Sequence, residues 1–155
     1  MPRVNGFSEA FPNSRFSNLK PEHVTGVIDL LQRISEFRPN FETYERNLIS
    51  YLSQDNLVAV VMEDLNGDVI GFGSLFLEKK LRGGVLGHVE DIVIAESHSG
   101  EGVGKQLVNH IVDLAVQLDC YKVTLSCSTD NQGFYEKCGF NQNGSSMSLL
   151  LAVIP

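Results

Sequence analysis

The chain has 155 residues, of which 43% are apolar and 20% charged, and its formal net charge at pH 7 is −7. This composition indicates one globular domain and argues against a disordered chain. The acidic balance argues against a broad surface for nucleic acid or anionic membrane, and the apolar runs are far shorter than the roughly 20 residues that cross a bilayer. Residues 1–15, rich in Pro, Asn, Ser and Gly, are expected to be a flexible N-terminal tail, and residues 16–155 to form the domain.

Two amphipathic helices are predicted after this tail. Pro21 begins the first helical pattern, in which apolar residues recur at spacings of three and four up to Ile34. The second helix is predicted over Phe41–Leu52, with Asn40 as its N-cap residue.

Two strands joined by a tight turn follow the helices. The apolar runs at residues 57–64 and 69–80 flank Asn66-Gly67, and an Asn-Gly pair between apolar runs is a strong hairpin signal. The next predicted strand, residues 88–95, is apolar except for Glu90 and Asp91 in its interior. Near-continuous apolar strands are usually central in a sheet, so two adjacent carboxylates within one require an explanation.

The last third of the chain continues the alternation of helices and strands. An amphipathic helix is predicted over about residues 103–118, a strand over 121–127 and a short helix over 131–137. The end of the chain is expected to form one or two strands. This order of elements predicts a mixed α/β domain built on one sheet.

A glycine-rich segment joins the carboxylate-bearing strand to the long helix. It contains Gly100, Gly102 and Gly104, followed by Lys105. The first N–H groups of a helix lack internal partners and carry partial positive charge, and glycines let a ligand approach them closely. The segment is therefore either an anion site suited to phosphate or only a turn. Its spacing fits neither the GxxxxGK[ST] phosphate loop nor the GxGxxG dinucleotide fingerprint.

This segment and its surroundings resemble the GCN5-related N-acetyltransferase (GNAT) family. Three blocks stand in the family's order, GHVEDIVI at residues 87–94, CYKVTL at 120–125 and FYEKCGF at 134–140, and the resemblance covers about residues 70–150. It implies an α/β (α+β) fold of the GNAT acyl-CoA N-acyltransferase type. In that fold a mixed central sheet is splayed at the cofactor site and flanked by helices.

The resemblance implies an N-acetyltransferase that transfers the acetyl group of acetyl-CoA to glucosamine 6-phosphate, an amino-sugar phosphate, for UDP-N-acetylglucosamine synthesis. Acetyl-CoA would lie in the splay, with its diphosphate on the loop amides and its pantetheine arm paired with a strand like an added strand. The residues implied to bind it are Ile92, Val93, Ile94, Ser99, Gly100, Glu101, Gly102, Val103, Gly104, Lys105, Asn131, Tyr135, Glu136 and Lys137. A homodimer is also implied, with C-terminal strands contributing to a shared site.

Three side chains are implied to carry out the acyl transfer. Tyr135 would protonate the departing sulfur, although a packed core tyrosine would give the same sequence signal. A backbone amide near Ile92, at the family's strand bulge, would polarise the carbonyl. Glu90 and Asp91 would place the sugar and take a proton, but successive strand residues point to opposite faces, so only one is expected to face the amine. The alternative for this pair is a structural ion pair with a cation of residues 79–82.

The implied substrate-binding residues are Ser35, Lys80, Arg82, Glu90 and Asp91. Lys80 and Arg82 would hold the sugar phosphate by charge, and the alternative is that they are solvated loop charges. Ser35 matches a hydroxyl residue that touches the sugar in the family.

Three departures from the family pattern affect the substrate assignment. Ser99 stands where the cofactor loop normally begins with Arg or Gln, so a long polar side chain is missing while the main-chain amides remain. Ser126 or Ser128 stands where this branch of the family has an acidic residue. Leu150 falls where the branch has an Arg that binds the sugar phosphate, a contact worth about 1.5–3 kcal/mol. Another cation, such as Lys80, Arg82 or Arg38, must compensate, or the substrate differs.

Two alternatives therefore stay open: a GNAT acetyltransferase of another small amine, and a non-catalytic acyl-CoA-binding homologue. No metal site is expected, since neither the histidines nor the three cysteines show ligand spacing, and no histidine partner supports a cysteine nucleophile. The odd number of cysteines indicates free thiols in a reducing cytoplasm. The first residues show no apolar stretch of a secretory signal.

Overall fold

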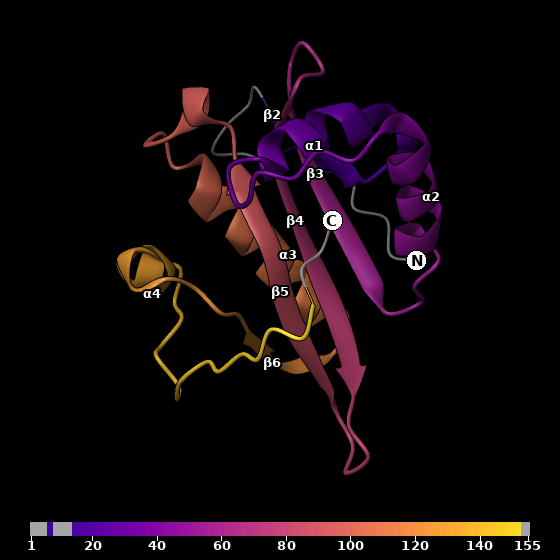
Figure 1. Cartoon of the computed structure of the whole chain (residues 1–155). Coiled ribbons are helices and arrows are strands. Elements are labelled where there is room, and N and C mark those ends of the chain that lie inside the picture. Colours follow the sequence, from indigo (N-terminus) through magenta and orange to yellow (C-terminus); the bar gives the residue numbers. More distant parts are fainter. Residues whose placement is uncertain (1–5, 8–13, 153–155) are drawn as a thin grey trace.

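The computed structural model describes residues 6–7 and 14–152 of the chain. One mixed sheet of six strands organises these residues, in the order β1-β2-β3-β4-β5-β6 (Figure 1). The strands are β1 (Gly6–Phe7), β2 (Ser14–Asn18), β3 (Leu57–Asp64), β4 (Val69–Lys79), β5 (Val85–Ile94) and β6 (Cys120–Thr124). All neighbouring pairs are antiparallel except β5 and β6, which are parallel. The mixed sheet confirms the predicted fold class.

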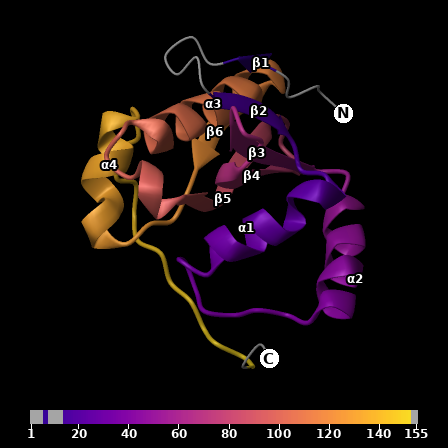
Figure 2. The ribbon, with the colours of Figure 1, turned by 90° about the horizontal axis from the view of Figure 1, so that it is seen from above.

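Helices cover both faces of the sheet. Two of them, α1 and α2, lie on one face and α3 lies on the other, so the sheet is the middle layer of three (Figures 1 and 2). The helices are η1 (Pro21–His23), α1 (Val24–Leu31), α2 (Phe41–Leu52), η2 (Glu96–His98), α3 (Val103–Gln117), η3 (Thr129–Asn131) and α4 (Gln132–Lys137). Within the described residues, no helix combines the length and apolarity that a membrane span requires.

Each face of the sheet has its own apolar core. Beneath α3, the side chains of Leu107, Ile111 and Leu114 recur at the spacing of one helix face and pack against Leu75 and Val89 of the sheet. The core beneath α1 and α2 consists of Leu19, Val27, Leu30, Leu57, Ala59, Val61, Phe72 and Val93. Each fully buried aliphatic side chain contributes roughly 1.5–3 kcal/mol, so the middle strands form a firm support for the groups at their ends.

Local sequence signals explain where several elements begin and end. Both α2 and β3 have their predicted bounds, and the side chain of Asn40 caps α2 by accepting the Thr43 N–H at 2.9 Å. Gly67 completes the predicted hairpin turn with a φ of 84°, which is a left-handed conformation. The first helix ends at Leu31 and not at Ile34, because the following N–H groups bond three residues back and tighten the chain into a turn.

The two ends of the chain differ from the prediction. Gly6–Phe7, inside the predicted flexible tail, pairs with β2, while residues 1–5 and 8–13 of that tail lie outside the described part of the chain. The C-terminal strand prediction is wrong: residues 141–152 form no strand, and β6 ends at Thr124 (Figure 1). A strand needs a partner for its backbone groups, and this segment pairs with no strand among the described residues.

An irregularity in β5 explains the two adjacent carboxylates. Phe72 of β4 pairs with Val93, but Ser74 pairs with Glu90, so two residues of β5 lie opposite the single residue Gly73. This two-against-one count is a β-bulge. Asp91 lies in the bulge with a φ of 55°, a conformation that costs a residue other than glycine about 1 kcal/mol or more. The expected strand bulge near Ile92 is therefore present.

The sheet opens between β5 and β6. Their parallel pairing runs from Val85 opposite Cys120 to His88 opposite Thr124, and beyond it β5 continues to Ile94 without a β6 partner. The predicted splay is thus confirmed. It leaves half of β5 with one free backbone edge.

Candidate functional site: the open edge of β5

The free backbone groups of β5 can be identified from the pairing on its other side. The N–H of Ala95 donates to the carbonyl of Ile70 at 2.8 Å, so Ala95 faces the β4 side. Neighbouring residues of a strand present their backbone groups to opposite sides. Ile94, and by the same alternation Ile92, therefore present N–H and C=O groups to the opening beside β6. This edge can accept an extended ligand as an added strand.

The glycine loop lies directly beyond this edge. Gly100 and Gly102 have φ values of 81° and 78°, and Gly102 is the N-cap residue of α3, where no side chain caps the helix. The first amides of α3 are therefore available to an anion. The N–H of Ser99 is engaged with the carbonyl of Glu96 at 3.0 Å, and the Val103 side chain is buried in the core. The loop can thus act through its backbone, chiefly at the glycines.

The third glycine of the loop has a packing role. A Cβ atom at Gly104 would lie 3.2 Å from the ring of Phe134 and 3.6 Å from the side chain of Ile94. The absence of a side chain therefore lets the start of α3 pack closely against both α4 and the end of β5. The three glycines of the loop are thus explained by two residues with left-handed φ, Gly100 and Gly102, and one close approach at Gly104.

The short helix α4 places an aromatic cluster beside this junction. Tyr135 makes edge-to-face contacts with Phe134 and Phe140, with ring centroids 4.9 and 6.0 Å apart. Burial raises the pKa of Tyr135, and the neighbouring thiols of Cys127 and Cys138 raise it further, so the phenol keeps its proton at neutral pH. A half-buried, protonated phenol is able to act as a proton donor. The other predicted cofactor residues of this region, Asn131, Glu136 and Lys137, are exposed.

A cavity of about 630 Å³ lies on the opposite face, between α1, α2 and the sheet. Its walls are mostly apolar and include Leu31, Leu48 and Phe72. Ser35 and Asp91 contribute polar groups to the lining, so the cavity brings two of the predicted substrate-binding residues together. Burial raises the pKa of Asp91, which is the change expected of a carboxylate prepared to take a proton.

The bulge alters the predicted orientation of the carboxylate pair. Val89 and Ile92, three residues apart, both pack in the core beneath α3. Glu90 alternates with Val89 and so faces the side of α1 and α2, where Asp91 also lines the cavity. The expectation that the pair points to opposite faces is therefore wrong, because it assumed a regular strand. Only Asp91 of the two borders the cavity.

The ion-pair alternative for these carboxylates is also wrong. In the described part of the chain neither Glu90 nor Asp91 pairs with a cation, and Lys80 instead pairs with Glu78. Glu78 also contacts His88 Nε2 at 2.6 Å. Lys80 is thus partly neutralised, whereas Arg82 lies in the exposed turn between β4 and β5 with no carboxylate partner among the described residues.

Sequence reasoning missed Tyr51 as a candidate for the cavity. Its spacing in the sequence fits the apolar face of α2, but its hydroxyl is buried in the cavity lining and has no hydrogen bond of good geometry. Burial and the nearby charge of Asp91 raise its pKa to about 12, although the Ser74 hydroxyl is near enough to oppose this rise. Ser74 itself donates to the carbonyl of Glu90 at 3.1 Å. The one signal in the sequence was the polar hydroxyl of a tyrosine on an otherwise apolar helix face.

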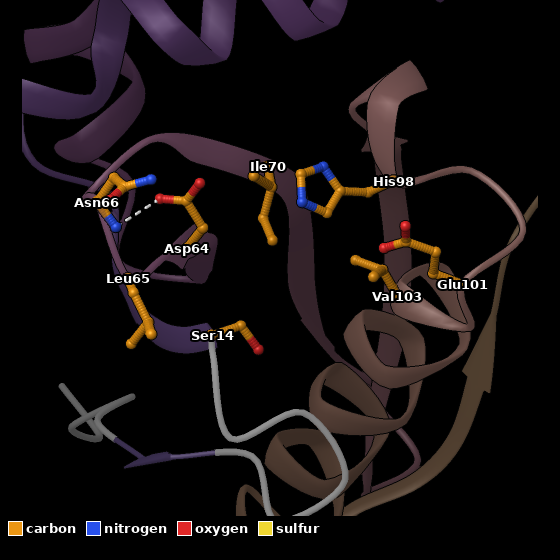
Figure 3. A pocket seen from close by; sticks show the side chains of 8 residues that line it. All are labelled: Ser14, Asp64, Leu65, Asn66, Ile70, His98, Glu101 and Val103. Carbon is orange, nitrogen blue, oxygen red and sulfur yellow. Dashed lines mark hydrogen bonds between the residues drawn. The ribbon is translucent and has the colours of Figure 1, made fainter.

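A second cavity, of about 280 Å³, lies on the other side of the glycine loop (Figure 3). Asp64 at the end of β3 and Asn66 of the following turn face His98 and Glu101 across it. Its two carboxylates disfavour a phosphate, so this cavity does not extend the anion site. Among the described residues no group of three His, Cys, Asp or Glu side chains could hold a metal ion.

Comparisons with known proteins agree with this arrangement. Residues 25–140 match the acetyltransferase (GNAT) family. The chain is 46% identical over 89 residues to glucosamine 6-phosphate N-acetyltransferase of Candida albicans, a match that covers 56% of this chain and 60% of that protein. It is 36% identical over 133 residues to the Arabidopsis thaliana protein of that name, covering 79% and 86% of the two chains. The crystal structure of glucosamine-6-phosphate N-acetyltransferase from Arabidopsis thaliana is similar with a TM-score of 0.82, at 30% identity, over 90% of this chain and 99% of that chain.

The close approach at Gly104 can be tested by paired substitutions. We expect Gly104→Val to be less stable than Gly133→Val by about 1–3 kcal/mol, because the new side chain meets Phe134, whereas nothing lies within 4 Å of a Cβ at Gly133. Both changes place valine in a helix, so their difference isolates packing. Chemical denaturation of the two variants measures it, and equal stabilities would contradict the packing role.

Proposed function

This chain belongs to the acetyltransferase (GNAT) family, and on that premise we propose that it transfers the acetyl group of acetyl-CoA to the amine of glucosamine 6-phosphate. Family members use acetyl-CoA as the donor, and two relatives named for the glucosamine 6-phosphate reaction support the acceptor. The observation that carries the proposal is the open edge of β5, which joins an anion-binding helix start to a cavity containing Asp91.

The donor is proposed to lie along this edge. The backbone groups of Ile92 and Ile94 would pair with the amides of the pantetheine arm, and the amides around Gly102 would hold the diphosphate. The backbone groups of Val93, between the two, pair with β4, so Val93 would make no hydrogen bond to the donor. This arrangement explains how an acidic chain holds a polyanion, since main-chain dipoles supply the positive potential.

The chemistry proposed is direct attack of the amine on the thioester. Asp91 takes a proton from the ammonium group, directly or through water, so that the neutral amine attacks the carbonyl carbon. An amide of the bulge near Ile92 polarises the carbonyl oxygen, and the C–S bond breaks as Tyr135 gives its proton to the leaving sulfur. The attacking nitrogen then loses its second proton, through water, to the Tyr135 phenolate, which leaves the neutral amide and the restored phenol. The two substrates meet because the bulge lies between the open edge of β5, here called the donor edge because acetyl-CoA would lie along it, and the cavity.

Phosphate recognition on this chain must differ from that of its family branch. Arg38 is paired with Asp29 at 2.7 Å and Lys80 with Glu78, which leaves Arg82 as the proposed contact for the sugar phosphate. The exposed Leu150 offers no charge. A second candidate is acetylation of another small amine. It is favoured by the absence of an arginine at the position of Leu150 and by the largely apolar walls of the cavity.

We also propose a homodimer and a cytoplasmic location. The C-terminal segment exposes four large apolar side chains, Met147, Leu149, Leu150 and Leu151. Such a run has strand-forming residues but no partner strand in the part of the chain that the structure describes, and a second copy would supply one. The free thiols of the cysteines support a reducing compartment.

The proposed reaction is tested by mixing the chain with acetyl-CoA and a panel of amines and following thiol release. We expect turnover with glucosamine 6-phosphate and at least tenfold lower kcat/KM with glucosamine, because the phosphate contact is charge-assisted. Turnover confined to another amine would instead establish the second candidate. Binding of CoA without turnover on any amine would contradict both and leave a non-catalytic acyl-CoA-binding protein.

The roles of the two carboxylates are separated by Asp91→Asn and Glu90→Gln. We expect Asp91→Asn to lower kcat by about 10²–10⁴-fold and Glu90→Gln by less than about tenfold, since only Asp91 borders the cavity. The base acts when deprotonated and its pKa is raised, so activity falls with decreasing pH through a value above that of an ordinary aspartate. A larger loss for Glu90→Gln than for Asp91→Asn would contradict this assignment.

The dimer is tested by introducing charge into the C-terminal segment. Leu149→Asp is expected to shift the chain toward monomer in analytical ultracentrifugation, because it places a carboxylate in the proposed strand pairing. Ser145→Asp, a change at another exposed residue nearer the start of the segment, is the control and should leave the dimer intact. A monomeric wild-type chain, or a Leu149→Asp variant that stays dimeric, would contradict the proposal.

A further inference from the structure

Arg33 links the end of α1 to the open edge of β5. It follows α1 in a tightened turn, where its N–H donates to the Leu30 carbonyl at 3.0 Å. Its side chain reaches across to β5, and the guanidinium Nη1 donates to the carbonyl of Ile94. Figure 2 shows α1 crossing the sheet toward this end of β5. The turn that ends the helix early therefore places a cation at the end of β5.

The carbonyl that Arg33 contacts belongs to the donor edge. Ile94 presents its backbone groups to the opening beside β6, and its side chain lies 3.6 Å from where a Cβ of Gly104 would be. Ile94 therefore contacts both groups: its carbonyl accepts from Arg33, and its side chain packs beside Gly104 in the first turn of α3, where unpaired amides favour an anion.

The charge of Arg33 is not neutralised by the protein. Two other arginines pair with carboxylates, Arg15 with Glu63 at 3.0 Å and Arg38 with Asp29 at 2.7 Å. In the part of the chain that the structure describes, Arg33 has no carboxylate partner, and its side chain is exposed. In a chain of net charge −7, an unpaired guanidinium at an anion site points to an anionic ligand.

We propose that Arg33 binds the diphosphate of the acyl donor, together with the amides of the glycine loop. This inference rests on the proposed use of acetyl-CoA and adds a residue to it. The guanidinium leaves the Ile94 carbonyl when the pantetheine arm pairs with β5, and it then donates to diphosphate oxygens. In this way α1 supplies the long polar side chain that Ser99 does not provide.

The proposal is tested by the affinity of the full-length chain for CoA, measured by calorimetry. We expect Arg33→Gln to weaken CoA binding about tenfold or more, because an amide replaces a charge-assisted contact, and Arg33→Lys to weaken it less. Arg38→Gln is the matched control: it removes the same charge five residues away, where Asp29 pairs with it, and should change the affinity by less than about twofold.

The choice of ligand identifies the phosphate involved. Dephospho-CoA keeps the diphosphate and lacks the 3′-phosphate, so Arg33→Gln should weaken the binding of CoA and of dephospho-CoA by the same factor. The affinity of the Arg33→Gln variant should also depend less on salt concentration than that of the wild-type chain. Wild-type binding that Arg33→Gln leaves unchanged or strengthens would overturn the role of Arg33 while the donor assignment stands. A loss confined to CoA would move the contact to the 3′-phosphate and overturn the diphosphate assignment. A wild-type chain that binds no CoA would contradict the proposed function and this inference alike.

Discussion

The unpaired outer edge of β5 is the constraint on which the rest of the site depends. Buried backbone N–H and C=O groups require partners, yet β5 loses its β6 partner beyond His88 and continues to Ile94. The groups of Ile92 and the N–H of Ile94 are then available to a ligand of extended shape, and among the described residues the Ile94 carbonyl is held only by the exposed side chain of Arg33. Because β4 pairs along the other side and a core lies on each face, this edge stays fixed in position without its second neighbour.

A single irregularity couples this edge to the acceptor cavity. The bulge at Asp91 reverses the usual alternation, so that Val89 and Ile92 share one core while Asp91 faces α1 and α2. The strained φ of 55° is maintained by the pairing on both sides of the bulge. One strand thereby offers backbone groups to a donor and a carboxylate to an amine, within a few residues of each other. Because the donor lies along the edge of the strand and the amine approaches from one face of the sheet, the two substrates can meet at the bulge.

Much of this fold could be predicted from local signals, and the remainder depends on contacts that local signals do not encode. The cap at Asn40, the Asn66-Gly67 turn and the long apolar strand 57–64 each have a short-range physical cause, and their bounds were correct. The glycine loop was also recognisable, although the packing of Gly104 on Phe134 was not. The sequence could not decide which of Glu90 and Asp91 borders the cavity, because the bulge that places Asp91 there depends on the register of two strands. The C-terminal strand was mispredicted because apolar, strand-forming residues do not specify a partner.

Amide hydrogen exchange with and without CoA tests the central claim about this edge most directly. The account predicts that CoA slows exchange at the N–H groups of Ile92 and Ile94 and at Gly102–Gly104, while amides of β5 that already pair with β4, such as Val93, change little. CoA binding that leaves Ile92 and Ile94 exchanging at their free rates, with protection elsewhere in the chain, would contradict it.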